Sequence, residues 1–200
     1  NVVAGASGGL TVTGDFLSAK SGAGTAAFAA GSSAGTTGQD QYAVAIGSQA
    51  GQNNQSEYAV AIGQQAGMTT QGVDAVAIGK QAGATTQGIA AVAIGDLAGT
   101  GSQGNQGVAI GFAAANTNQG AGGVAIGIAS GQTNQGANAV SIGRSANTGQ
   151  SAKAIAIGYF AGQTDQGEYG IAIGDNAGFD TQSINSIAIG QQAGQNTQGA

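Results

Sequence analysis

The sequence contains no cysteine, histidine, proline or tryptophan, and only 6% of its 200 residues are charged. Without cysteine, the chain can form no disulfide, thiolate nucleophile or cysteine-based metal site. Without histidine, it lacks the commonest general base and transition-metal ligand, so no Ser-His-Asp or Cys-His arrangement can form within it. We therefore predict that the protein is not an enzyme and has no catalytic, cofactor-binding or metal-binding residues.

Charge is also too sparse to define a charged partner. The four cations are Lys20, Lys80, Arg144 and Lys153, and they cannot build the basic face that nucleic acid requires. The carboxylates at Asp165, Glu168, Asp175 and Asp180 lack the spacing of a calcium loop. Apolar runs are short and interrupted by glycine, so we predict no transmembrane helix. We expect membrane attachment only through a region outside this chain.

Glycine, by contrast, is abundant, with 40 residues, and it follows a repeat. The motif Val-Ala-Ile-Gly, or a close variant, recurs ten times at intervals of 16 residues, with one interval of 15. The repeated isoleucines are Ile46, Ile62, Ile78, Ile94, Ile110, Ile126, Ile142, Ile157, Ile173 and Ile189. Such regular spacing indicates a repeat architecture and not a low-complexity coil.

Each repeat predicts one coil of a parallel β-solenoid. Bulky and small residues alternate in Ala43-Val44-Ala45-Ile46-Gly47, which is the period-2 pattern of a strand. The glycine permits a sharp corner, and a recurring glutamine, as at Gln55 and Gln71, marks the second one. Like residues would stack at about 4.8 Å per coil, so the glutamines can hydrogen-bond along the stack.

The repeat divides the chain into two parts. Residues 28–200 are predicted to form the repeat domain of about eleven coils. Phe28-Ala29-Ala30-Gly31 aligns with Val44-Ala45-Ile46-Gly47, and Gln39 fits the glutamine column, which indicates a degenerate first coil. Residues 1–27 are predicted to be an atypical N-terminal segment or cap.

A single coil is too thin to hide both faces of its strands. We expect Val and Ile to line the interior and the Ala/Gly face to form contacts between chains, although the reverse assignment stays open. Either face is too apolar for water over ten coils, and few charges are present to keep the rod soluble. We therefore expect lateral association of chains.

The Val-Ala-Ile-Gly repeat over residues 28–200 resembles the head repeats of trimeric autotransporter adhesins, the YadA-like head. The resemblance implies a left-handed parallel β-roll, a homotrimer, and a location at the cell surface of a Gram-negative bacterium. There such heads bind host-surface proteins or glycans and contribute to virulence. Similar repeats occur in viral and phage attachment proteins, so a fibre on a virion surface is the alternative. The 16-residue period is longer than is usual for the bacterial heads, and no stalk heptads or membrane-anchoring barrel are seen in this chain.

Ligand specificity is expected where the copies differ. Two variable positions follow the repeated glycine, and their most aromatic or apolar members are Tyr159, Phe160, Phe112 and Ile128. Another variable position precedes each strand and contains Tyr42 and Tyr58 in successive coils. These six residues are our candidate ligand-contact surface, since exposed rings can stack on sugars or grip a protein. Packing between chains, or an aromatic ladder at the corner, is the structural alternative.

Other patterns in the repeats predict pairs or suggest other functions. Lys80 and Asp96 share a column and should pair at the surface, and Arg144 should stack on Tyr159. Threonines such as Thr69-Thr70 and Thr85-Thr86 suggest an ice-binding array, but their column is repeatedly interrupted. Gly99 to Gly104 match the G-x-G-x-x-G motif, but a corner with no following helix cannot serve as a dinucleotide site.

Overall fold

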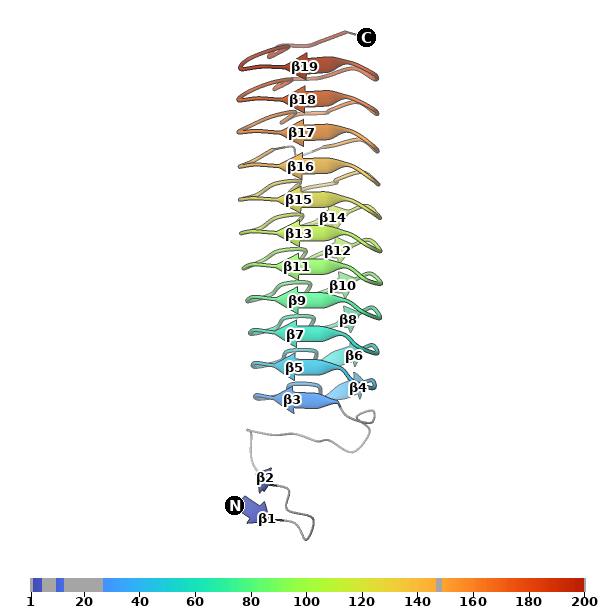
Figure 1. Ribbon diagram of the computed structural model, residues 1–200, viewed down its shortest axis with the longest axis vertical. Helices are drawn as coiled ribbons and strands as arrows, with labels where there is room; N and C mark the ends of the chain where they lie inside the picture. Colours follow the sequence, from blue (N-terminus) through green and yellow to red (C-terminus); the bar gives the residue numbers. More distant parts are fainter. Residues whose placement is uncertain (1, 5–9, 13–26, 147–148, 200) are drawn as a thin grey trace.

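The computed structural model of the chain describes residues 2–4, 10–12, 27–146 and 149–199. These described residues form strands and turns, with no helix among them. The chain winds into a rod of stacked coils, with one parallel sheet on each of two sides (Figure 1). In Figure 1 the near strands run from right to left while the chain rises from its N-terminus to its C-terminus, so the coils turn in the left-handed sense. The predicted all-β, left-handed parallel β-solenoid is confirmed.

The larger sheet has eleven strands, one from each coil. They are β3 (Phe28–Ala30), β5 (Val44–Ile46), β7 (Val60–Ile62), β9 (Val76–Ile78), β11 (Val92–Ile94), β13 (Val108–Ile110), β15 (Val124–Ile126), β16 (Val140–Ile142), β17 (Ile155–Ile157), β18 (Ile171–Ile173) and β19 (Ile187–Ile189). Every neighbouring pair is parallel and joins equivalent positions of the repeat, such as Val92 with Val108. The sequence period alone therefore sets the register.

The smaller sheet has six strands, on the opposite side of the coil. They are β4 (Thr37–Gln39), β6 (Asn53–Gln55), β8 (Thr70–Gln71), β10 (Thr86–Gln87), β12 (Ser102–Gln103) and β14 (Asn118–Gln119). Beyond β14 the stack continues through single bridges between glutamines, as from Gln166 to Gln182. Two further strands, β1 (Val2–Ala4) and β2 (Leu10–Val12), form an antiparallel pair.

The degenerate first coil forms as predicted. Strand β3 pairs with β5, joining Phe28 to Val44, and the pairing of β4 with β6 joins Gln39 to Gln55. The proposed cap, residues 1–27, lies mostly outside the described residues.

Alanine lines the interior of the coil. In most repeats the alanine between the two bulky strand residues and the alanine three residues after the glycine are buried, as for Ala93 and Ala98. The interior is narrow: a Cβ placed on Gly99 would lie 3.0 Å from Oε1 of Gln103 and 3.3 Å from Cβ of Ala93. Only methyl groups and one amide per coil fit between the two sheets.

The amide in each coil belongs to the repeated glutamine, which is buried. Nε2 of Gln87 donates to the carbonyl oxygens of Val76 at 2.7 Å and Ala91 at 3.1 Å. Nε2 of Gln71 donates to Oε1 of Gln87 at 3.1 Å, so the predicted amide ladder exists. Within the described part of the chain the ladder is interrupted where buried Oε1 atoms have no donor, at Gln71, Gln103 and Gln119. The glutamines tie the smaller sheet to the larger one.

The expectation that Val and Ile line the interior is wrong. The side chains of the Val/Ile pair lie on the outer face of the larger sheet, where Ile78 and Ile94 are 37% and 36% exposed. The intervening Ala77 and Ala93 point inward and are fully buried. The reason is the width of the coil, because glutamine already reaches across from the opposite sheet and leaves no room for a branched side chain.

The repeated glycine forms the corner after each strand of the larger sheet. Gly95 has a φ of 127°, a region that L side chains rarely adopt. A Cβ on Gly95 would also lie 2.5 Å from the carbonyl oxygen of Gly111 in the next coil. Both the turn and the close stacking of coils therefore require glycine here.

The one short interval is absorbed without loss of register. Strand β16 still pairs with β17, joining Ile142 to Ile157, so the missing residue falls in the corner between Ala146 and Gln150. Residues 147–148 in this corner lie outside the described ranges.

Two buried serines replace alanine next to the shortened corner. Oγ of Ser130 donates to the carbonyl oxygen of Ser141 at 2.7 Å and lies 2.9 Å from its Oγ. Oγ of Ser141 accepts from the backbone N–H of Gly131 at 3.0 Å and donates to the carbonyl oxygen of Ala146. The serine pair thus supplies local hydrogen bonds where the repeat lacks a residue.

Candidate functional site

The six candidate residues lie on two separate corners of the rod. We call the turn after each strand of the larger sheet the post-strand corner. Three of its columns contain Ser48, Gln49 and Gln52 and recur at the repeat period. We call the turn before each strand the pre-strand corner, whose column begins at Tyr42. Phe112, Ile128, Tyr159 and Phe160 lie on the post-strand corner, whereas Tyr42 and Tyr58 lie on the pre-strand corner.

Backbone hydrogen bonds hold the post-strand corner in register. The backbone N–H of Ala129 donates to the carbonyl oxygen of Phe112 at 2.8 Å, and that of Phe160 donates to Arg144 at 3.1 Å. The second corner position is left-handed in successive coils, with φ of 53° at Ala129 and 52° at Phe160. Side chains in one column therefore repeat at the strand spacing of about 4.8 Å.

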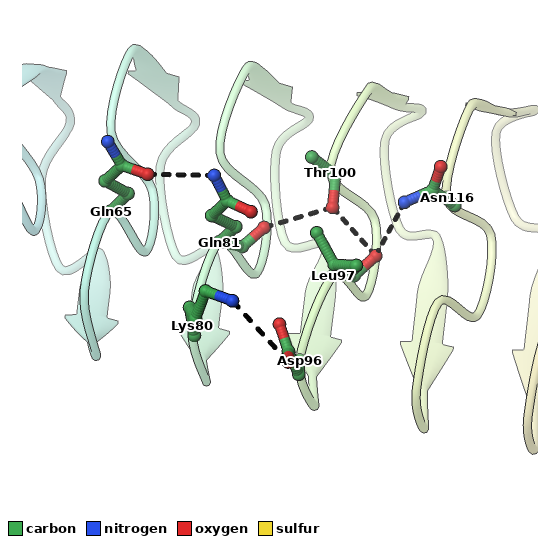
Figure 2. A network of polar contacts seen from close by, with 7 residues as sticks. All are labelled: Gln65, Lys80, Gln81, Asp96, Leu97, Thr100 and Asn116. Atoms are coloured by element: carbon green, nitrogen blue, oxygen red, sulfur yellow. Dashed lines mark hydrogen bonds and ion pairs between the residues drawn. The ribbon is translucent and has the colours of Figure 1, made fainter.

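The post-strand corners follow one another along the rod, and those of its N-terminal half are polar. Figure 2 shows Gln65 and Gln81 of neighbouring coils pointing toward each other, and Nε2 of Gln81 donates to Oε1 of Gln65 at 2.9 Å. Lys80 and Asp96 lie 4.0 Å apart in the adjacent column, as predicted. Both are well exposed, so this ion pair contributes about 0–1 kcal/mol.

The polar network continues into the third column. Oγ1 of Thr100 donates to the carbonyl oxygens of Gln81 at 3.1 Å and Leu97 at 2.8 Å (Figure 2). Nδ2 of Asn116, one coil further on, donates to the same carbonyl of Leu97 at 3.1 Å. The polar side chains in this part of the rod therefore form hydrogen bonds within their own corner and with the adjacent coil.

The C-terminal half of the post-strand corner contains an aromatic cluster. The ring centroids of Tyr159 and Phe160 lie 4.1 Å apart, and Phe160 meets Phe179 of the next coil edge-on at 6.0 Å. The guanidinium carbon of Arg144 lies 5.7 Å from the ring centroid of Tyr159, which confirms the predicted stacking. Phe179 is not among the predicted residues, because it lies outside the two positions that follow the repeated glycine and only the folded coil brings it to Phe160.

Phe112 and Ile128 precede this cluster along the rod. Each is 52% exposed, and they occupy the same column as Arg144 and Tyr159. Four of the six candidate residues therefore lie on the post-strand corner, with Arg144 between Ile128 and Tyr159 in their column.

The two remaining candidates form a separate aromatic pair. The rings of Tyr42 and Tyr58 are stacked, with centroids 5.2 Å apart and planes within 2°. A hydrogen bond to the carboxylate of Glu57, together with its negative charge, raises the pKa of Tyr58. This geometry is the corner ladder that the sequence analysis gave as the structural alternative, and it confirms that the two rings stack.

The pre-strand corner also contains a polar cluster that the sequence analysis missed. Nζ of Lys153 lies 2.8 Å from the hydroxyl of Tyr169 and 3.4 Å from a carboxylate oxygen of Glu168. The hydrogen bond to Tyr169, followed by that to Glu168, raises the pKa of Lys153. Lys153 and Tyr169 share a column one coil apart, which was a usable signal in the sequence.

The smaller sheet presents a polar outer face. Thr70 and Thr86 are exposed there, but the column continues as Ser102 and Asn118. The regular threonine array that an ice-binding surface would need is therefore interrupted within six strands.

Other chemistry finds no support in the described residues. No three acidic side chains among them lie close enough together to hold a metal ion. The segment from Gly99 to Gly104 forms a corner and strand β12, and no helix follows it in this part of the chain. The described ranges also include no helix that is long and apolar enough to cross a bilayer.

A continuous apolar surface lies on the outer face of the larger sheet, which we call the Val/Ile face. It comprises the first and third residues of ten successive strands, from β5 to β19. Five of these twenty side chains are at least 36% exposed, and the other fifteen are half-buried. A continuous apolar surface along ten coils marks an interaction site.

Comparisons of the chain with protein-family models, with curated proteins and with solved structures found no match.

Proposed function

We propose that the chain is the rod-shaped part of a homotrimeric attachment protein, in which three solenoids associate through their Val/Ile faces. The outward orientation of this face is the observation that carries the proposal. The alanines on the opposite face of the same strands are buried inside the coil, so the Val and Ile side chains are the ones available to a partner. Association would remove twenty partly exposed apolar side chains per chain from water, and this burial is the driving force.

The resemblance of the repeats to YadA-like heads supports a trimer over a dimer. It also supports a position on the surface of a bacterial cell or a virion, with attachment through a region outside this chain. The rod would bind a host-surface protein or glycan through its corners, where successive coils differ. Three parallel rods would present each corner three times, so weak contacts would add up to avidity.

Sedimentation of the purified chain tests the trimer. We expect the mass of three chains, and we expect the double variant Ile78→Glu/Ile94→Glu to dissociate, because it buries four ionised groups when both chains of a contact carry it. The matched control Thr70→Glu/Thr86→Glu places the same charges on the smaller sheet and should stay trimeric. A stable monomer of the unaltered chain would refute the association.

Adhesion is tested with the trimer immobilised on a sensor surface. We expect retention of whole host cells or extracellular-matrix preparations, and loss of retention when the trimer is dissociated by Ile78→Glu/Ile94→Glu. Absence of retention on every cell and matrix preparation would refute the attachment function while leaving the assembly intact.

A further inference from the structure

We propose that the C-terminal half of the post-strand corner is a binding site for saccharides that carry a carboxylate, with Arg144, Tyr159, Asp175 and Asn176 as the contact residues. The inference rests on the proposed attachment function and names the chemical class of its ligand. The four residues come from three successive coils and lie in two adjacent columns. The two coil intervals between Arg144 and Asp175 span about 10 Å, which suits a disaccharide.

Arg144 supplies the acidic preference. In the described part of the chain Lys80 and Lys153 each pair with a carboxylate, whereas Arg144 has no ion-pair partner. Its side chain is exposed, and its guanidinium lies beside the ring of Tyr159. A guanidinium can grip a carboxylate through two parallel hydrogen bonds, so this unpaired group is suited to an anionic sugar.

Tyr159 supplies a stacking platform. It is 42% exposed, so its ring is accessible, and it packs against Phe160 with ring centroids 4.1 Å apart. Phe160 is in turn supported by Phe179. Aromatic side chains combine a large apolar surface with little conformational freedom, which favours flat, partly apolar ligands such as pyranose rings.

The fold of the post-strand corner fixes the position of Phe160. Its φ of 52° lies in the left-handed region, as does the φ of 62° at Leu97 in the same column. Other coils place Gln, Leu, Ala, Ser or Asn at this position. The aromatic ring at Phe160, and therefore its contact with Tyr159, is specific to this coil.

Asp175 and Asn176 supply hydrogen bonds for hydroxyl groups. Nδ2 of Asn176 donates to Oδ1 of Asp175, and the backbone N–H of Asn176 donates to the carbonyl oxygen of Tyr159 at 2.9 Å. The exposed carboxylate can accept from sugar hydroxyls, while its charge repels an anionic group at this end. The two ends of the site therefore differ. The ligand carboxylate would lie at Arg144, and the ligand hydroxyl groups would lie at Asp175.

Calorimetric and NMR titrations of the trimer with soluble saccharides test the proposal. The probes are digalacturonate and a sialyllactose, with galactobiose and lactose as their respective neutral counterparts. We expect at least one acidic probe to bind more tightly than its neutral counterpart and to shift the resonances of Tyr159. Binding by none of the acidic probes at millimolar concentration, or equal binding of acidic and neutral partners, would overturn the proposal.

Variants test the assigned roles. Arg144→Gln should weaken binding of the acidic probe roughly 10- to 100-fold and remove the preference over the neutral sugar, and Arg144→Lys should restore part of it. Tyr159→Ala should weaken binding of acidic and neutral probes alike. The control Lys80→Gln removes the same charge from the same column and should bind as the unaltered chain does. Equal effects of Lys80→Gln and Arg144→Gln would reduce the site to non-specific charge attraction and overturn it.

Two outcomes separate this proposal from the attachment function. If cell or matrix retention persists at full strength in Arg144→Gln and Tyr159→Ala, the chain is an attachment rod whose ligand binds elsewhere, and the saccharide site is wrong. If Tyr159→Ala dissociates the trimer, the ring packs between chains and the site is also wrong. Retention that is lost together with saccharide binding, in intact trimers, supports both.

Discussion

Replacing Gln87 with leucine should destabilise its coil by about 3 kcal/mol, although the two side chains are similar in size. Gln87 is buried between the two sheets, where its amide makes three hydrogen bonds. Two are donated to the carbonyl oxygens of Val76 and Ala91, and one is accepted from Gln71. At about 1 kcal/mol each, their loss sums to about 3 kcal/mol.

Leucine has no donor, so its burial would leave the carbonyl oxygens of Val76 and Ala91 without the hydrogen bonds that Gln87 provides. The carbonyl oxygen of Ala91 also accepts the backbone N–H of Val76, so the lost amide weakens a site that holds two coils together. The amide of Gln71 keeps its bonds to Val60 and Ala75. The disturbance should therefore be confined to the coils that contain β9 and β11.

Native-state hydrogen exchange measures such a local effect, because each coil of a repeat protein contacts mainly its neighbours. We expect backbone amides of β9 and β11 to exchange roughly 100-fold faster in Gln87→Leu, and those of β18 to be unchanged. All samples are compared at the same chain concentration.

Gln65→Leu is the matched control. Gln65 also belongs to a glutamine ladder, donating to Gln49 and accepting from Gln81, but this ladder lies on the post-strand corner and is half-buried. Water can replace its hydrogen bonds, so we expect a change of less than about 1 kcal/mol. Equal acceleration of exchange in the two variants would refute the reasoning that burial makes the inner ladder stabilising.

Three further predictions concern corners, charges and a buried hydroxyl. Gly95→Ala should prevent folding or cause aggregation, because the added Cβ would meet the backbone of the next coil. In Gly190→Ala the added Cβ has no neighbour within 4 Å from other parts of the described chain, so this variant should fold with only the strain of its positive φ. Circular dichroism and sedimentation distinguish the two variants. Glu57→Gln should lower the pKa of Tyr58, since the carboxylate that raises it is removed, and an NMR pH titration of the tyrosine ring measures the change. Ser141→Ala should cost about 1–3 kcal/mol in urea unfolding, because it removes a buried hydroxyl with donor and acceptor partners; a neutral result would show that the shortened corner does not need it.

Much of the fold could be predicted from the spacing of like residues. Because stacked coils pair residues that are one period apart, the interval of 16 residues was enough to predict that Val92 pairs with Val108 and Gln71 with Gln87. The same argument correctly paired Lys80 with Asp96, and Arg144 with Tyr159. Contacts within one column follow from the repeat, since the column neighbour is the nearest residue whatever the shape of the coil.

Contacts between columns depend on how each corner bends, and the period carries no information about this. Phe160 reaches Phe179, which lies in a different column one coil further on, and the sequence analysis did not identify this contact. The division of the six candidate residues between two corners, by contrast, follows from their positions before and after the strand in the repeat.

The sequence by itself determined the strands, their register and the chemistry of each column, because these follow from alternation and period. It could not determine which face of the larger sheet points inward, because a strand such as Val92–Ile94 has apolar residues on both of its faces. The tertiary structure decided this through the width of the coil. Gln103 reaches across from the opposite sheet, so only the methyl group of Ala93 fits inside, and the branched side chains are left on the surface, where a partner can bury them.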